Sequence, residues 1–361
     1  MMQPATLQKR RLRWGLFILA LLAPLQAAAI ESAVEIEARR AYPARDDDAA
    51  STLHIIGTTE ASVMDGLVQA YRARYPKVAV IYDQATSRAV FDAVEGNVDV
   101  DGSTYDLAIS SAMDLQIKLV NDGRAREHRS VATARLPRWA TWRDRIFGFT
   151  REPAVIIYNT EAFRDIPVPQ SRFELANLLR RAPELFERRI ATYDPEVSGL
   201  GYLFATQDSL QSDTYWRLME IFGNLSARMS CCSSEMLDQV ASGEIALAYN
   251  VLGSYAQVWR DGGAPIGIVL PRDYTLLMLR TALIPLASDN VGAAGDFIDF
   301  LVSEDGARVI RHEAYLSPVL PEGDDGTLLP VRLGPGLLVF LDALKRRAFL
   351  SEWASAVAER R

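Results

Sequence analysis

Small hydroxyl and glycine residues recur in this sequence where a predicted strand gives way to a predicted helix. Hydroxyl groups and free backbone N–H groups at a helix start donate hydrogen bonds to anions, with support from the helix dipole. The positions that could hold a ligand in this way are Thr58, Thr59, Ser110, Ser111, Ser198 and Gly199, and Tyr249 and Asn250 would face the ligand from the end of a further predicted strand. Ordinary helix capping and turn formation explain the same residues without a ligand. An anion site is therefore one of two open interpretations of this pattern.

Arg151 is the candidate for recognising charge. It lies in a long β-rich segment over residues 146–159, and a guanidinium group binds a carboxylate or a phosphate through two parallel hydrogen bonds. A surface arginine paired with Glu152 is the alternative interpretation.

The sequence lacks the residue patterns of the common hydrolases. It contains no Gly-x-Ser-x-Gly, no P-loop and no His-Glu-x-x-His, and its three histidines are scattered. Nucleophilic hydrolysis needs a Ser or Cys beside a His and an orienting acid. We therefore expect a protein that is not an enzyme.

The cysteines of this chain are Cys231 and Cys232, which are adjacent. They could form a strained vicinal disulfide in an oxidising compartment, but a reduced or solvent-side pair in a loop is the interpretation we favour. A four-ligand metal framework cannot be built from two cysteines, and His54, His128 and His312 are far apart in the sequence. We expect neither a metal site nor a cofactor.

The first 29 residues have the order of a secretory signal peptide. Four basic residues precede an apolar run over residues 14–22, and Ala27-Ala28-Ala29 follows as a small-residue cleavage site. The run is well short of the roughly 20 apolar residues that span a bilayer. We predict export to the periplasm, with an uncleaved N-terminal anchor as the alternative, and we expect residues 30–51 to be a flexible leader.

The charge of the exported chain argues against nucleic acid as a partner. Removing residues 1–29 with their four basic side chains takes the net charge from −7 to −11. Nonspecific nucleic-acid binding needs a basic surface. A small anionic ligand is still compatible with this charge, because a buried site depends on local amides and on one or two side chains.

The body of the chain alternates predicted strands with predicted helices, which is the pattern of a parallel α/β sheet. The segment 146–159 is long enough to cross between two lobes, and a second β-rich passage over 266–285 could return the chain. These crossings predict a discontinuous lobe 1 (52–152 and 273–361) and a continuous lobe 2 (153–272). Such an architecture places its cleft at the hinge, where strand ends and helix starts converge.

An ordered set of motifs resembles a known family. After the export signal come GTTE, YDLAISSAMD, FTREPAVIIYN, YDPEVSGLGYLFATQD and ALAYNVLGSYA. In this order they resemble the periplasmic solute-binding proteins of ABC importers. The group that they resemble is the type II group, which contains ferric-iron binders, sugar-phosphate binders and the phosphoglycerate-responsive sensor component. The likeness runs from about residue 52 to 320.

The resemblance implies an α/β, two-lobed periplasmic-binding-protein fold of type II, or Venus flytrap, with a mixed sheet in each lobe and a hinge crossing. It implies capture of a small anionic solute, either a phosphorylated metabolite or an organic carboxylate, and delivery to an inner-membrane ABC permease by a monomer. A sensor kinase in place of the permease is an alternative partner. Ferric iron is the alternative cargo, although the adjacent tyrosine pair typical of iron binders is absent here. The positions that match the family's binding residues are Thr58, Thr59, Ser110, Ser111, Ser198, Gly199 and Tyr249.

Overall fold

The structure is a computed structural model that describes residues 34–46, 50–97, 99–100, 103–312, 316–319 and 327–358. The segment predicted to be a signal peptide, residues 1–29, lies outside the described residues. The chain from Val34 onward forms one compact unit. None of the helices in the described ranges combines the length and the apolar composition that a membrane span requires.

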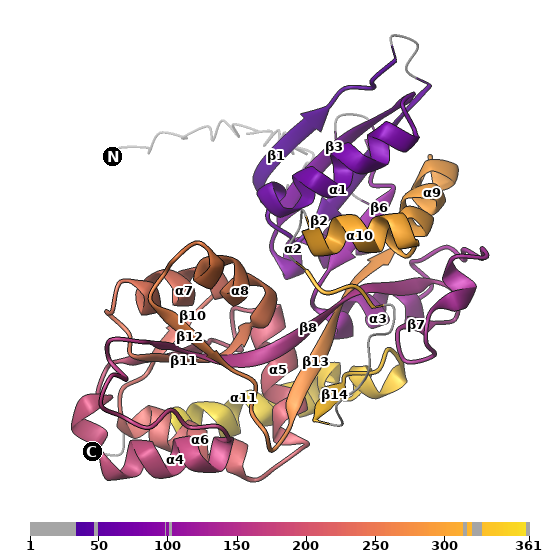
Figure 1. Cartoon of the computed structure of the whole chain (residues 1–361). Coiled ribbons are helices and arrows are strands. Elements are labelled where there is room, and N and C mark those ends of the chain that lie inside the picture. Colours follow the sequence, from indigo (N-terminus) through magenta and orange to yellow (C-terminus); the bar gives the residue numbers. More distant parts are fainter. Residues whose placement is uncertain are drawn as a thin grey trace, which may run out of the picture. The chain divides into compact units, whose positions relative to one another are not determined.

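The unit is built from alternating strands and helices (Figure 1). The strands are β1 (Ile36–Tyr42), β2 (Ser51–Gly57), β3 (Val78–Ala85), β4 (Asp99–Val100), β5 (Ser103–Thr104), β6 (Leu107–Ser110), β7 (Thr141–Trp142), β8 (Ile146–Asn159), β9 (Ile190–Tyr193), β10 (Arg228–Ser230), β11 (Leu247–Leu252), β12 (Ile266–Val269), β13 (Thr275–Leu283) and β14 (Leu328–Pro330). The helices are α1 (Ala61–Arg74), α2 (Ser87–Glu95), α3 (Met113–Asn121), α4 (Arg172–Arg181), α5 (Gly199–Ser209), α6 (Thr214–Asn224), α7 (Ser233–Ala241), α8 (Gly253–Asp261), α9 (Val291–Leu301), α10 (Glu304–His312) and α11 (Ala343–Val357). Short 3-10 turns are η1 (Thr133–Arg135), η2 (Pro183–Leu185) and η3 (Pro335–Leu341).

Lobe 1 is formed around a mixed sheet in the order β1-β3-β2-β6-β13-β8. The strands β3, β2 and β6 are parallel, whereas β1 pairs antiparallel with β3, and β13 pairs antiparallel with β6 and β8. The carboxyl ends of the three parallel strands therefore lie along the same edge. The helices α1, α2 and α3 begin directly after β2, β3 and β6, so their N-termini lie at this edge.

Lobe 2 repeats this arrangement in a second mixed sheet. Its strands β11, β9 and β10 are parallel, and β8 pairs antiparallel with β11 and with β12. The helices α5, α7 and α8 begin after β9, β10 and β11. Each lobe thus presents three helix N-termini at the carboxyl edge of its parallel strands.

The strand β8 pairs with strands of both lobes and so joins their sheets into one 12-stranded sheet (Figure 1). Its first part, Phe147–Pro153, pairs with β13 of lobe 1, and its second part, from Ala154, pairs with β11 and β12 of lobe 2. The segment is rich in β-branched and aromatic residues, which favour extended backbone. The expectation of one long strand over residues 146–159 is therefore confirmed.

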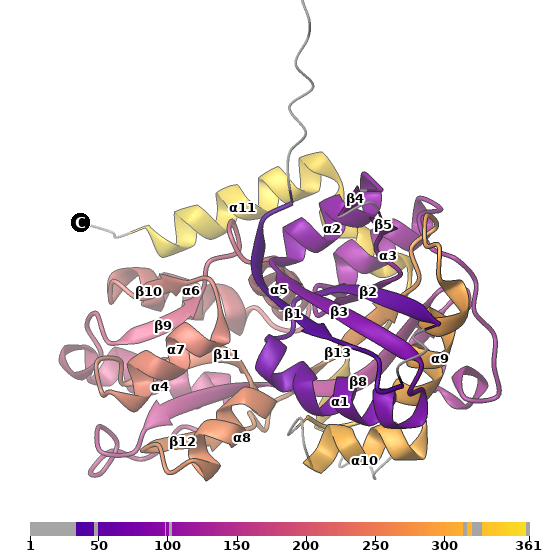
Figure 2. The same ribbon diagram turned by 90° about the horizontal axis from the view of Figure 1, so that it is seen from above.

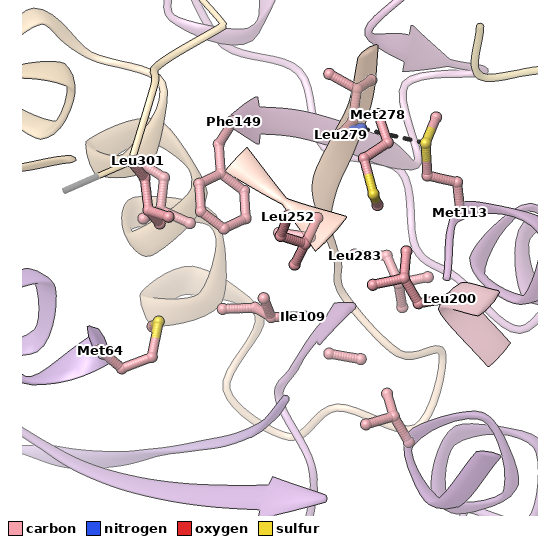
Figure 3. Packing of buried hydrophobic residues seen from close by; sticks show 14 of the residues in the cluster. Met64, Ile109, Met113, Phe149, Leu200, Leu252, Met278, Leu279, Leu283 and Leu301 are labelled. Carbon is pink, nitrogen blue, oxygen red and sulfur yellow. Dashed lines mark hydrogen bonds between the residues drawn. The ribbon is translucent and has the colours of Figure 1, made fainter. Parts of the chain in front are cut away.

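A hydrophobic cluster extends through both lobes. Met113 and Leu279 of lobe 1 belong to the same buried cluster as Leu200 and Leu252 of lobe 2. Figure 3 shows these four side chains together with Phe149 of β8, and it shows the hydrogen bond that the Leu279 N–H donates to the Met113 sulfur at 3.2 Å. Continuous apolar packing therefore accompanies β8 through the junction of the lobes.

A second cluster fills the other face of the lobe 2 sheet. It combines residues of α4, α5 and α6 with Phe349 and Trp353 of the last helix. The helix α11 packs on α6, and η3, directly ahead of it, packs on α3 of lobe 1. The assignment of the whole segment 273–361 to lobe 1 is corrected at this point, because the apolar face of α11 is buried in lobe 2.

The predicted flexible leader, residues 30–51, is also corrected where the structure describes it. Ile36–Tyr42 forms β1, which pairs antiparallel with β3 at the edge of the lobe 1 sheet. Arg39 of β1 forms an ion pair with the buried Asp83 at 2.6 Å. The pairing with β3 supplies the backbone hydrogen bonds that the polar, aperiodic sequence of this segment did not reveal.

Candidate functional site

Both sets of helix starts contribute to one cavity of about 230 Å³. Its lining includes residues at the N-termini of α1, α2 and α3 from lobe 1 and of α5, α7 and α8 from lobe 2. The N-cap residues of α1, α3, α7 and α8 form no side-chain cap hydrogen bond. These N-cap side chains therefore do not occupy the N–H groups of the first turns, although Gln84 accepts the Ala61 N–H at 3.0 Å and Asp114 accepts the Leu115 N–H at 2.9 Å. The helix dipoles add partial positive charge.

Thr58 and Ser111 lie on the lobe 1 side of the cavity. The Ser111 N–H donates to the Thr58 hydroxyl at 3.3 Å, and the two hydroxyl oxygens are 3.5 Å apart. The Thr58 N–H donates to the carbonyl of Ile109 at 3.0 Å, which fixes the turn after β2 against the end of β6. Both hydroxyl groups are thus positioned by neighbouring parallel strands.

Ser198 and Gly199 lie on the lobe 2 side of the same cavity. Ser198 caps α5 by accepting the Gly201 N–H at 3.1 Å. A side chain at Gly199 would meet Ser87 of α2, since a Cβ built there would be 2.9 Å from the Ser87 Cβ. The helices α2 and α5 are in contact across the lobes (Figure 2), so glycine permits their close approach.

Arg280 of β13 is a cationic lining residue that the sequence reasoning missed. It is buried, its guanidinium is 3.2 Å from Glu152 of β8, and it donates a hydrogen bond to the Thr59 hydroxyl. Its Nε forms no hydrogen bond within the described part of the chain. Burial alone would lower the pKa of Arg280, but Tyr255 and Glu152 outweigh burial and raise it, so the guanidinium stays charged.

Two tyrosines and two carboxylates also line the cavity, together with Arg88 and further uncharged polar residues. Tyr193 is the last residue of β9, and Tyr255 lies in the first turn of α8. Burial raises the pKa of both phenols, which keeps them neutral hydrogen-bonding groups. Glu37 of β1 and Glu60 before α1 add acceptors.

Several predicted site residues lie behind the cavity rather than in its lining. Thr59 is buried, and its hydroxyl accepts from Arg280. The Ser110 hydroxyl accepts the Ala112 N–H at 3.1 Å, as a local cap before α3. Arg151 lies within β8, opposite Leu279 of β13, and does not line the cavity.

Tyr249 and Asn250 also lie outside the cavity lining, since β11 continues to Leu252 instead of ending at Tyr249. Both donate to the carboxylate of Asp208, Tyr249 at 2.5 Å and Asn250 at 2.9 Å. Asp208 is buried, with the buried Arg172 at 3.2 Å. The two residues therefore belong to a buried ionic network of lobe 2.

Cys231 and Cys232 form a disulfide and both contribute to the cavity wall. The interpretation of a reduced pair is therefore wrong. Together with Glu235 they are the one group of His, Cys, Asp and Glu atoms close enough for a shared metal ion in the ranges that the structure covers. The two sulfurs are bonded to each other, and His54 and His128 do not line the cavity.

A larger surface hollow, of about 1260 Å³, lies on lobe 1 alone. It is bordered by the end of α1, by η1 and by α10, with Arg74, Arg135 and Arg308 among its charged residues. No residue of lobe 2 contributes to it. A solute enclosed between two lobes would not bind there, so the smaller cavity is the candidate site.

The comparisons with known proteins agree with this architecture. A protein-family model described as "bacterial extracellular solute-binding protein" matches residues 53–315. A solved structure of the substrate-binding protein of an ABC transporter from Agrobacterium tumefaciens is 33% identical in sequence, with a TM-score of 0.83 over 89% of this chain and 98% of that chain. A search of curated proteins finds no match to this chain.

More distant structures share the fold. The periplasmic binding protein AfuA from Actinobacillus pleuropneumoniae, solved with fructose-6-phosphate, is 16% identical with a TM-score of 0.68 over 85% of this chain and 99% of that chain. Iron-bound HitA from Pseudomonas aeruginosa is 16% identical with a TM-score of 0.64 over the same shares. The matches named here are binding proteins rather than enzymes. The chain belongs to the bacterial extracellular solute-binding protein family and has the two-lobed type II fold of the binding proteins that serve ABC transporters.

Proposed function

We propose that this protein is a periplasmic binding protein that captures a small anionic solute, a phosphorylated metabolite or an organic carboxylate, for an ABC importer. The observation that carries the proposal is the convergence of six helix N-termini and the buried cation Arg280 on one cavity. Helix N-termini and a guanidinium are the donors that proteins use for phosphate and carboxylate groups.

The carboxylates of Glu37 and Glu60 refine the proposed solute class. They accept hydrogen bonds and repel a second anion, so the part of the solute that faces them carries hydroxyl groups rather than a further acidic group. A volume of about 230 Å³ suits a small molecule of this kind. A hydroxylated monophosphate or hydroxy acid satisfies both sides of the cavity.

Ferric iron is the second candidate cargo, because Tyr193, Tyr255 and Glu60 bring oxygen donors to the same cavity. Iron requires the phenolate form of a tyrosine ligand. Burial raises the pKa of Tyr193 and Tyr255, so both phenols hold their protons in the unliganded site. Deprotonating either phenol costs free energy, and this cost favours an organic anion over ferric iron as the cargo.

A thermal-shift screen of the purified protein tests the proposal. The panel contains phosphorylated sugars, phosphoglycerates, di- and tricarboxylates and ferric citrate. A ligand at about 100 times its dissociation constant adds roughly 2.7 kcal/mol to the free energy of unfolding, which raises the melting temperature. A shift with ferric citrate alone would establish the iron alternative, and turnover of any panel member would contradict a binding-only role.

The variant Gly199→Val tests the site itself. The added side chain would occupy the contact with Ser87 and block close approach of α2 and α5, so we expect loss of the ligand-induced shift with the fold retained. Gly292→Val is the matched control, because Gly292 is also near the start of a helix but a Cβ there meets no atom within 4 Å. An unchanged shift in Gly199→Val would place the ligand elsewhere.

The partner in the membrane is testable separately. We propose an ABC permease, in line with the transporter named for the 33% identical structure; a sensor kinase is the alternative. Reconstituted permease whose ATPase activity rises with the loaded binding protein would support import. Kinase autophosphorylation that responds to the loaded protein would support sensing.

A further inference from the structure

The vicinal disulfide lies where a cross-link contributes little to stability. A disulfide stabilises a fold mainly by closing a loop of chain, and its effect grows with the length of that loop. Cys231 and Cys232 are adjacent, so no loop lies between them. Cys231 is exposed, Cys232 is half-buried and both line the cavity. The bond is thus accessible to reagents, and exposed disulfides are the labile ones.

The disulfide is directly joined to the start of α7. Cys232 is the N-cap residue of this helix and forms no side-chain cap hydrogen bond. Ser233, the next residue, accepts the Leu252 N–H at 3.2 Å and shares a hydrogen bond with the Tyr193 hydroxyl. Leu252 and Tyr193 also line the cavity. A displacement of Cys232 would therefore also displace Ser233, Leu252 and Tyr193, which all line the cavity.

The two sulfurs differ in exposure and in their position relative to α7. The Glu235 carboxylate lies 3.7 Å from the Cys231 sulfur and within 4.8 Å of the Cys232 sulfur, so it opposes negative charge on both. Cys232 is the N-cap residue of α7, where the helix dipole stabilises negative charge. The preferred thiolate leaving group is therefore Cys232, and the exposed Cys231 sulfur is the point of attack.

We propose that Cys231–Cys232 is a redox-active site that controls anion binding in the cleft, with a dithiol as its reductant. One thiolate of the dithiol bonds to the Cys231 sulfur and breaks the S–S bond, and the electron pair leaves on Cys232. The second thiol of the reductant, after losing its proton, displaces Cys231, which takes up a proton. The reductant is thereby oxidised to its disulfide and the protein holds two reduced cysteines.

Reduction weakens anion binding for an electrostatic reason. The Cys232 thiolate accepts hydrogen bonds from the first turn of α7 and brings negative charge into the cavity, so it competes with an anionic solute for the same N–H groups. This consequence rests on the proposed function. We expect phosphate binding to weaken about three- to tenfold on reduction.

The test uses the native full chain with inorganic phosphate as the probe. Dithiothreitol followed by iodoacetamide and mass spectrometry reports whether the folded protein gains two alkylated cysteines. Calorimetry gives the phosphate dissociation constant before and after reduction, and hydrogen exchange follows the Ser233 and Ser234 amides. The variant Cys231→Ser/Cys232→Ser is the control, and neither its phosphate affinity nor its exchange should respond to dithiothreitol.

The outcomes separate the redox proposal from the proposed function. Reduction of the folded protein with weaker phosphate binding supports both. Reduction that leaves the phosphate affinity unchanged, or failure of the native disulfide to react, overturns the redox proposal. If phosphate binds in neither state, free phosphate is not the solute, and the ligand panel decides the proposed function. Hydrogen exchange then decides the redox proposal: unchanged exchange of the two serine amides on reduction overturns it, and altered exchange supports it.

Discussion

At the scale of single residues, the same side-chain type has different roles because its surroundings differ. Asp83 and Asp208 are buried in ion pairs, whereas Asp114, in the first turn of α3, is buried with its own backbone neighbour Leu115 as hydrogen-bond donor at 2.9 Å. Burial raises the pKa of Asp114 to about 6, although helix N–H groups and Arg346 of α11 oppose the rise. Ionising Asp114 at neutral pH therefore costs free energy.

This burial predicts a pH-dependent stability. The folded pKa lies above the unfolded value of about 3.9, so the folded state holds its proton more tightly and loses stability as the pH rises through about 4 to 6. Asp114→Asn removes the ionisation. We expect it to raise the free energy of unfolding by up to about 3 kcal/mol above pH 7 and to leave it nearly unchanged near pH 4.

Urea unfolding at both pH values measures this difference. Asp305→Asn is a suitable control, because Asp305 pairs with Arg74 at the surface, and exposed pairs contribute little. An equal effect of Asp114→Asn at both pH values would mean that ionisation is not the cause.

At the scale of secondary-structure elements, α11 illustrates how burial on one face fixes a helix. Phe349 and Trp353, one turn apart, insert into the second cluster of lobe 2, and Phe349 packs against Tyr202 and Trp216. Leu344 on the same helix is 73% exposed. The side of α11 that carries Phe349 and Trp353 therefore provides most of the helix's contribution to the free energy of unfolding.

A pair of alanine substitutions tests this division. Trp353→Ala should lower the free energy of unfolding by about 3–5 kcal/mol, because it removes a buried ring and leaves a cavity. Leu344→Ala should change it by less than about 0.5 kcal/mol. Chemical denaturation of both variants provides the comparison, and equal effects would show that α11 does not pack as described.

The elements that could be predicted from sequence are those with strong local signals. The apolar residues Met64, Leu67 and Val68 of α1 repeat at helical spacing, which is a local signal, and the β-rich run 146–159 predicted β8. Thr58 and Ser111 followed from strand ends that were located correctly. These features depend on neighbours in the chain, which a sequence displays directly.

The features that sequence reasoning missed depend on distant partners. Tyr249 was expected at a strand end, but Asn250, with φ of 63°, forms an irregularity that lets β11 continue to Leu252. Arg280 lies in an apolar strand, and its partner Glu152 is on a different strand. Neither the spacing nor the composition of a sequence shows such pairings, because the two residues come together only when separate strands pair in the fold.

At the scale of the whole molecule, the two lobes share a crossing strand and a hydrophobic cluster. Because the first cluster includes residues of both lobes, loss of either lobe would expose apolar surface of the other. We therefore expect the chain to unfold in a single cooperative transition.

Single-tryptophan variants can test this cooperativity. One variant would retain Trp139, which packs against the first cluster, and the other would retain Trp353 of the second cluster. Coincident urea midpoints from their fluorescence, matched by circular dichroism, would support one transition. Separate midpoints would show that each lobe unfolds alone.

The first described strand has a practical consequence for anyone shortening this chain. A truncated protein that begins at residue 50 would lack β1, and β3 would then present a row of unsatisfied backbone N–H and C=O groups along its outer side. An unpaired sheet edge of this kind pairs with strands of other molecules and promotes aggregation. The buried Asp83 would also lose its Arg39 counter-ion. A shortened protein that begins at residue 34 keeps β1, and the outer edge of β3 then stays paired.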